Sequence, residues 1–240
     1  MIDEVSIHED FSVGTYLDRS LDTLKDEFQK SDVVIIAGGS GLYIKALTEG
    51  IDIFPGVKEE DKAFYNNLFE QEGIGVLQKE LENKDLSYYL KVDRENPHRL
   101  IRALSVIKSS GQPFSSFLKK ERVDRGFQSI LIALERPRSE LYDRINQRVD
   151  MMMDAGLLDE VKSLHQHRHL KSLNTVGYKE LFSFIDGNCT LAYAIDKIKQ
   201  HSRNYAKRQI TWFKNQQDYT HFHPDAVDQM IEFIEGKKIS

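Results

Sequence analysis

Cysteine, long apolar runs and an excess of basic charge are all missing from this 240-residue sequence. The single cysteine, Cys189, excludes an internal disulfide framework and fits a reducing compartment. No run approaches the roughly 18–20 apolar residues of a membrane span, and the start lacks the basic and apolar regions of a signal peptide. The net charge of −5 means that any site for a polyanion must be local. We therefore expect a cytoplasmic protein without a membrane contact.

A glycine-rich turn stands between a β-branched run and a helical pattern near the start of the chain. Residues 32–37 predict a buried strand, Gly38 to Gly41 a tight turn, and residues 42–49 a helix. A further helix is expected over residues 13–28. This order is typical of a parallel α/β sheet, and free N–H groups in the turn could bind a phosphate. The turn lacks the lysine of GxxxxGK[ST], so a role in packing alone is the alternative.

The middle of the chain, from Pro55 to Val123, reads as amphipathic helices without a strand signal. A helical block of this kind inside an α/β pattern suggests an inserted domain. We therefore expect core segments at residues 1–55 and 124–240 around a helical insertion at residues 56–123.

The last part of the chain begins with a second buried-strand pattern at residues 129–134, followed by a helix from Glu140 that Ser139 caps. From there the sequence reads as helical almost to its end. Breaks are expected near residues 174–177, 186–188 and 223–224.

An arginine pair follows the helix start at Asn96, a natural N-cap, and Pro97. Leu100, Leu104 and Ile107 form the buried stripe of this helix, which leaves Arg99 and Arg102 on an exposed face. Guanidinium groups match phosphate oxygens two at a time, so the pair could clamp a phosphate. A solvated face is the alternative.

A second pair, Arg144 and Arg148, lies one helical turn apart. Two arginines at this spacing repel each other unless an anion or an acid lies between them. Asp143 and Asp150 could be that acid, and a diphosphate is the sharper candidate.

The segment from residue 197 to 214 holds six Lys or Arg and no Asp or Glu. Lys199, Arg203 and Lys207 recur every four residues, so a single helix would carry a basic stripe. Tyr205 and Trp212 are interleaved with these cations, which suits bases stacked beside a phosphate backbone. The pattern favours nucleic-acid contact over the alternative, core aromatics with solvating lysines.

We do not predict a metal site at the histidines. His165, His167 and His169, with His221 and His223, lack Cys or Glu partners and have cations beside them.

Five segments in order resemble the tRNA dimethylallyltransferases, the isopentenyl-diphosphate:tRNA transferases. These segments are AGGSGLYIKAL, NPHRLIRALSV, LYDRINQRVDMMMDAGLLDEV, NTVGYKEL and YAKRQITWFK, and the resemblance spans essentially the whole chain. It implies a P-loop-type parallel-sheet α/β core, incomplete at its N-terminus, with a helical insertion and a helical C-terminal part. It further implies a monomer that uses Mg²⁺ and moves a dimethylallyl group from dimethylallyl diphosphate to N6 of the adenosine beside the anticodon in the tRNA anticodon arm.

The resemblance also implies roles for single residues. Ser40 stands where the family usually has Thr, a tRNA contact near the flipped adenosine, and Lys62 resembles a basic tRNA contact. Arg148, or else Arg144, matches the arginine that steadies the leaving diphosphate. Candidate diphosphate contacts also include Gly38 and Gly39. The other implied tRNA contacts are His98, Arg99, Arg102, Thr175, Val176, Gly177, Tyr178, Lys179, Lys207, Arg208, Gln209, Thr211, Trp212 and Lys214, although Asn96 and His98 replace the more common Asp and Gln.

Two family segments have no counterpart in this sequence: the P-loop GxTxxGK[ST], and a DSxQxY-like segment whose Asp is the general base. Residues 1–13 resemble a region downstream of both, so we expect an N-terminally truncated chain. Such a chain would lack the diphosphate cradle, the main Mg²⁺ ligand and the base. It would bind tRNA without full activity.

Three other functions fit parts of the pattern. An adenylate isopentenyltransferase would act on free nucleotides and would not need the basic C-terminal segments. A non-catalytic RNA-binding relative would keep those segments without the chemistry. A nucleoside monophosphate kinase relative is disfavoured by the missing lysine-bearing loop.

Overall fold

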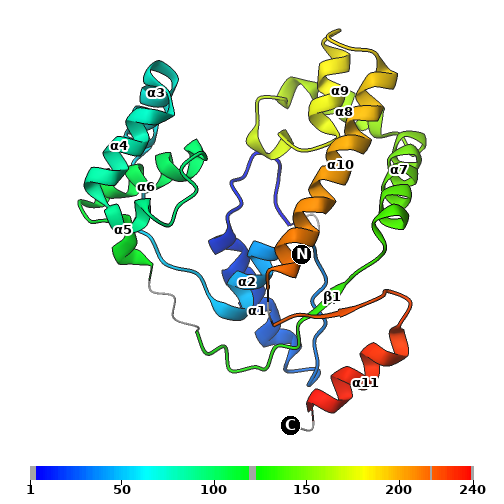
Figure 1. The fold of residues 1–240 in the computed structure, drawn as a ribbon. Helices are drawn as coiled ribbons and strands as arrows, with labels where there is room; N and C mark the ends of the chain where they lie inside the picture. Colours follow the sequence, from blue (N-terminus) through cyan, green and yellow to red (C-terminus); the bar gives the residue numbers. More distant parts are fainter. Residues whose placement is uncertain (1–3, 119–122, 217, 239–240) are drawn as a thin grey trace. The chain divides into compact units, whose positions relative to one another are not determined.

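The computed structural model describes residues 4–118, 123–216 and 218–238. The chain divides into two compact units (Figure 1). Unit 1 consists of Met1–Thr48 and Arg125–Ser240, and unit 2 of Glu49–Asp124. Among the described residues, no helix combines the length and the apolar character that a bilayer span needs.

The first part of unit 1 contains the two expected helices. Helix α1 (Val13–Glu27) begins where the Ser12 hydroxyl accepts a hydrogen bond from the Thr15 N–H at 3.1 Å. Helix α2 (Gly41–Glu49) follows the glycine turn. Both predictions are confirmed.

The strand expected at residues 32–37 is wrong. Val33, Ile35 and Ile36 are 41%, 85% and 46% exposed, and the segment has no regular structure. The sheet that the described residues form contains β1 and β2 only, so the β-branched run has no ladder partner there.

The sheet of unit 1 is a single parallel pair. Strand β1 (Ile132–Leu134) pairs with β2 (Thr220–Phe222) in the register Ile132 to Thr220 and Leu134 to Phe222. The strand expected over residues 129–134 is therefore confirmed for its last three residues. Strand β2 was not expected, because three residues are too few to show a period-two pattern.

Five helices follow β1 in the described residues of unit 1. They are α7 (Arg138–Asp154), α8 (Leu157–Leu164), α9 (Tyr178–Ile185), α10 (Leu191–Lys214) and α11 (Val227–Lys238), with short 3-10 turns at His165–His167 and Lys171–Leu173. Helix α7 begins at Arg138 after Pro137, so the expected cap at Ser139 is wrong. The expected breaks at residues 174–177 and 186–188 are confirmed, whereas the break at Ala155 and Gly156 was missed.

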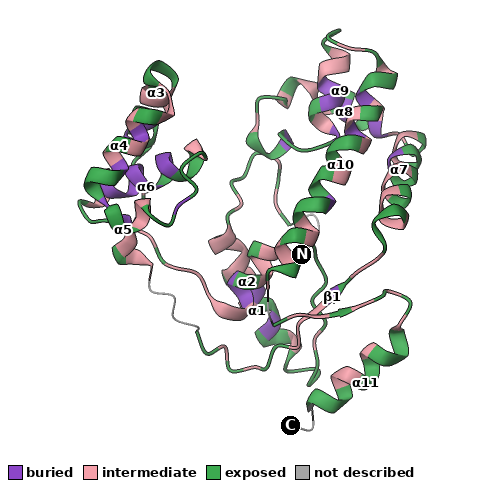
Figure 2. Ribbon diagram, viewed as in Figure 1, coloured by how far each residue is buried: buried purple, intermediate pink, exposed green. Residues whose placement is uncertain are grey.

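The core of unit 1 lies between α7, α8, α9 and α10, where the buried side chains gather (Figure 2). Its fully buried members include Val161, Leu181 and Ile198. They come from α8, α9 and α10 respectively, so the burial of these apolar side chains holds α10 against its neighbours.

The regular structure of the described residues of unit 2 is entirely helical. It contains α3 (Glu59–Glu72), α4 (Ile74–Lys84), α5 (Leu86–Tyr89), α6 (Pro97–Ser110) and a 3-10 turn at Phe114–Phe117. Asn96 caps α6, as expected, by accepting a hydrogen bond from the Arg99 N–H at 3.3 Å. Leu100 and Leu104 lie in the centre of its core. The expected insertion, residues 56–123, lies within the range of this unit. Residues 119–122 lie outside the described residues. The role of the insertion in tRNA binding stays a prediction.

Candidate nucleic-acid interface

The expected basic stripe lies on one helix, because α10 runs unbroken from Leu191 to Lys214. Its first half faces another helix rather than solvent. The Lys199 ammonium lies 2.6 Å from an Asp150 carboxylate oxygen, and the Arg203 guanidinium donates to the Asn146 side-chain oxygen at 2.5 Å. Both partners belong to α7. These two cations therefore join α10 to α7, and the continuous open stripe is confined to the second half of α10.

The second half of α10 offers the open cationic face. A hollow of about 520 Å³ is lined by Asn204, Lys207, Arg208, Thr211, Trp212 and Asn215. Lys207 and Arg208 are exposed, and the Arg208 guanidinium carbon lies 5.7 Å from the centre of the Tyr205 ring. Two cations beside an indole ring form a surface that suits a phosphate and a stacked base.

The glycine turn packs directly against this part of α10. The Gln209 side-chain amide donates to the Gly39 carbonyl at 2.7 Å. A Cβ placed on Gly41 would lie 2.4 Å from Trp212 Cε3, which is closer than real Cβ contacts. Gly41 is therefore needed for the indole ring to approach the start of α2. The structure thus brings together two segments that the sequence separates by 170 positions.

The segment from Thr175 to Lys179 forms the turn before α9 and the first two residues of that helix. Gly177 has φ = 103°, a conformation that favours glycine, and its N–H donates to a Glu180 carboxylate oxygen at 2.7 Å. Thr175, Val176 and Lys179 are exposed.

Two carboxylates, those of Glu180 and Glu160, accept hydrogen bonds from Gly177 and Tyr178. Glu180 is only 8% exposed and also accepts a hydrogen bond from His201 Nδ1 on α10 at 2.5 Å. The Tyr178 hydroxyl donates to Glu160, and burial together with that carboxylate raises the pKa of Tyr178 to about 12. Tyr178 is therefore an uncharged donor at neutral pH. The Glu180 and His201 pair was missed by sequence reasoning, although Glu three residues after Gly177 is a capping signal.

Replacement of Glu180 by alanine is expected to reduce the free energy of unfolding by about 1–3 kcal/mol, because it removes the acceptor of the Gly177 N–H. Thermal unfolding should shift down by about 2–4 °C for each kcal/mol. The matched control is Glu232→Ala on the exposed part of α11, which should unfold like the wild type. Equal melting temperatures for Glu180→Ala and Glu232→Ala would contradict the structural role of Glu180.

Arg144 and Arg148 lie on α7, exposed and one turn apart. Neither has an ion pair with another residue in the part of the chain that the structure describes. Asp150, considered above as their acid, instead pairs with Lys199. At about 100° per residue, the two arginines point about 120–160° away from Asn146 and Asp150, which mark the face that binds α10. The structure therefore does not bring the arginine pair to the basic stripe.

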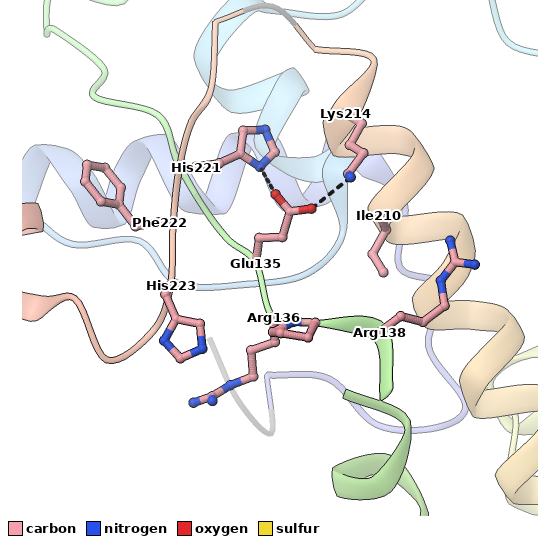
Figure 3. A pocket seen from close by; sticks show the side chains of 9 residues that line it. Glu135, Arg136, Arg138, Ile210, Lys214, His221, Phe222 and His223 are labelled. Carbon is pink, nitrogen blue, oxygen red and sulfur yellow. Dashed lines mark ion pairs between the residues drawn. The ribbon is translucent and has the colours of Figure 1, made fainter. Parts of the chain in front are cut away.

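A second hollow, of about 440 Å³, opens where the two strands end. Figure 3 shows Glu135 between Lys214, at 2.9 Å, and His221, at 3.3 Å. The hydrogen bond from Lys214, and then the charges of Lys214 and His221, lower the pKa of Glu135. Lys214 is thus engaged by a carboxylate instead of standing free for RNA.

Two other cations of this hollow also have carboxylate partners, whereas Arg138, which lines it too, has no ion pair among the described residues. Arg136 pairs with Glu140 and, at 3.2 Å, with Asp225. His223 lies 3.5 Å from Asp225. Apart from that of Arg138, the charges are compensated within the cluster, so we assign no anion to it. Sequence reasoning missed the cluster, because its residues come from two distant segments, 135–140 and 214–225.

The candidate residues of unit 2 lie on two helices. Lys62, on α3, lies 3.9 Å from Glu59, and His98 and Arg99 are exposed at the start of α6. The Arg102 guanidinium carbon lies 5.3 Å from the centre of the Phe54 ring. Arg102 thus packs on an aromatic ring and still presents its charge at an exposed position.

The described residues include no group of three His, Cys, Asp or Glu side chains that could hold a metal ion. His165 instead binds Asp186 at 2.8 Å. The described residues therefore do not fit the Mg²⁺ that the resemblance implies, because Mg²⁺ prefers several oxygen ligands in octahedral geometry. The steps proposed below involve none of that metal's chemistry.

The chain matches a family model described as IPP transferase over residues 1–216. The chain belongs to the IPP transferase family. This membership confirms the resemblance drawn from the five sequence segments. The matched range includes the glycine turn, both arginine pairs and the whole of α10.

Individual members of the IPP transferase family are similar over almost the full chain. A tRNA dimethylallyltransferase of Christiangramia forsetii is 46% identical over 237 residues, which is 98% of this chain and 78% of the relative. The solved tRNA isopentenylpyrophosphate transferase of Bacillus halodurans is 32% identical with a TM-score of 0.67, covering 98% of this chain and 77% of that one. A eukaryotic dimethylallyltransferase acting on tRNA shares the fold, with a TM-score of 0.77 at 18% identity, over 97% of this chain and 64% of that one. The expected α/β class is thus confirmed as a mostly helical fold with a small parallel sheet.

Proposed function

We propose that this chain transfers a dimethylallyl group from dimethylallyl diphosphate to N6 of the adenosine adjacent to the anticodon of a tRNA. One observation carries the proposal: the glycine turn lies against the open cationic face of α10, in a chain that belongs to the IPP transferase family. A turn suited to phosphate and a surface suited to RNA then meet at one place.

The reaction is a displacement at the allylic carbon. The bond between that carbon and the diphosphate oxygen breaks, the bond to N6 forms, and the amine releases one proton to solvent water. Negative charge grows on the departing diphosphate, so donors and cations aimed at it lower the barrier. Gly38 and Gly39 supply exposed main-chain groups. The resemblance assigns the guanidinium to Arg148, or else Arg144, although both lie on the face of α7 that points away from α10, so their contact with the diphosphate is the part of the proposal that the turn does not support.

The RNA must present an unstacked adenosine, because an amine inside a stacked loop is out of reach. Trp212 and Arg208 line one hollow and offer an aromatic face and a cation for neighbouring nucleotides. Ser40, with Thr175 to Lys179, would contact the RNA close to the extruded base. Further phosphates of the anticodon arm would bind Lys62, His98, Arg99 and Arg102 on unit 2.

The transfer can be measured with labelled dimethylallyl diphosphate and three acceptors: unmodified tRNA, the same tRNA with the adenosine replaced by guanosine, and AMP. We expect label in the first acceptor only. Equal label in AMP would identify an adenylate isopentenyltransferase instead. Binding of tRNA with no transfer to any acceptor would identify a non-catalytic RNA-binding relative.

The affinity for tRNA should fall with salt, and Lys207→Ala or Arg208→Ala should flatten the slope of log K against log salt concentration by about one unit. Each substitution removes one exposed cation of the open face. Lys199→Ala is the matched control on the same helix, because Lys199 is 21% exposed and already paired with Asp150. A slope that changes as much for Lys199→Ala as for Lys207→Ala would place the RNA elsewhere.

A further inference from the structure

Gln209 follows Arg208 of the open α10 face in the sequence, but its polar group is not directed to solvent. Its Nε2 donates to the Gly39 carbonyl at 2.7 Å, and the side chain is only partly exposed. Lys207, Arg208 and Thr211 around it are all exposed. An amide that is engaged by the main chain of another segment is poorly placed to read a nucleotide.

We propose that Gln209 is a positioning residue that couples the RNA-binding face of α10 to the glycine turn. It acts through the Gly39 carbonyl and sets the conformation of the turn in response to bound tRNA. This role rests on the proposed function, in which the turn contacts the diphosphate and the adenosine. It differs from the direct tRNA contact that the resemblance implies for Gln209.

The geometry explains why this one hydrogen bond matters. Residues 38–40 are exposed and carry no side chain larger than that of serine, so their main chain has little apolar packing of its own. The peptide held at Gly39 immediately precedes Ser40, whose carbonyl accepts hydrogen bonds from Tyr43 at 3.0 Å and Ile44 at 3.1 Å. Fixing the Gly39 carbonyl therefore sets the direction in which Ser40 enters α2.

The glycine at position 39 is matched to Gln209. A Cβ there would lie 2.4 Å from Gln209 Nε2 and would displace the amide at the end of its flexible side chain. Gly39→Ala and removal of the amide should consequently break the same contact from its two sides. Residues that act through one contact give non-additive effects when both are changed.

The test is amide hydrogen exchange with and without tRNA on the whole chain. In the wild type, tRNA should slow exchange in both residues 204–214 and 38–44. In Gln209→Met, which keeps the side-chain length but cannot donate, tRNA should still protect residues 204–214 while the protection of residues 38–44 falls about two- to tenfold, the equivalent of one ordinary hydrogen bond.

Gln216→Met is the matched control. Gln216 also donates its amide to a main-chain carbonyl, that of Trp212 at 3.2 Å, and this hydrogen bond does not involve the glycine turn. It should keep the wild-type protection of residues 38–44. Gly39→Ala should reproduce Gln209→Met, and Gly39→Ala with Gln209→Met together should be no worse than either alone.

Three results would overturn the coupling role. They are unchanged protection of residues 38–44 in Gln209→Met, an equal loss in Gln216→Met, or losses that multiply in the double variant. Failure of the proposed function gives a different result: tRNA then slows exchange in no part of the wild-type protein, before any variant is compared. In that case the exchange of residues 38–44 without tRNA would still be faster in Gln209→Met than in Gln216→Met if Gln209 holds the turn.

Discussion

Replacement of Arg148 by alanine is expected to lower the rate of dimethylallyl transfer by about 100-fold or more, the usual loss when a group that stabilises developing negative charge is removed. Arg148 is exposed on α7 and has no carboxylate partner among the described residues, so its charge is available to a ligand. The affinity for tRNA should stay close to that of the wild type, because the arginine lies on the far side of α7 from α10. Single-turnover transfer and tRNA binding measure the two effects separately.

Arg144→Ala and Arg168→Ala complete this comparison. Arg144 shares the exposed face of α7, and we expect a smaller loss from its removal than from that of Arg148. Arg168 lies 3.9 Å from Asp186. Arg168→Ala removes the same charge elsewhere in unit 1, so this variant should transfer the dimethylallyl group at the normal rate. Inorganic diphosphate should raise the melting temperature of the wild type and not that of Arg148→Ala. A normal transfer rate in Arg148→Ala would remove it from the site.

Replacement of Gly41 by alanine should weaken tRNA binding by about tenfold and destabilise unit 1 by about 1–3 kcal/mol, as overpacking does in a tight contact. The added Cβ would meet three carbons of the Trp212 ring at 2.4–2.5 Å, and a rigid ring cannot bend away. The indole must therefore leave its place beside Lys207 and Arg208. Chemical unfolding and tRNA titration measure the two losses.

Gly75→Ala is the control for Gly41→Ala. Gly75 lies on α4, where an added Cβ meets nothing within 4 Å, so alanine should be neutral or slightly stabilising. In a Trp212→Ala background the Gly41→Ala change should cost little stability, since the clashing ring is gone. An undiminished cost in that background would show that the strain at Gly41 does not come from Trp212.

Helix α6 and helix α10 illustrate what the sequence could predict. Asn96, Pro97 and Gly111 mark the bounds of α6, and the signals for a helix start and end lie within a few residues of each other. The charge segregation on α10 is equally local. The strand at residues 32–37 failed because a strand needs a neighbour, and no pattern within six residues reveals whether one is present.

The contacts within the candidate site were beyond local patterns for the same reason. Asp150 and Lys199 read as separate surface charges until α7 and α10 pack together. Gln209 and Gly39 are separated by 170 positions, and their partnership depends on the fold of all of unit 1. The resemblance correctly indicated the family, but the roles of single side chains depend on which neighbour each one meets.

The parallel pair of β1 and β2 has a consequence for the order in which unit 1 folds. Only three register pairs join the strands, and Thr220 follows Ile132 by 88 positions. Closing so long a loop costs chain entropy that three residue pairs cannot repay alone. Helices α7 to α10 must therefore pack first and deliver the two strands to each other. The charged hollow around Glu135 is then among the last parts of unit 1 to assemble, and it forms only in molecules whose α10 is already in place.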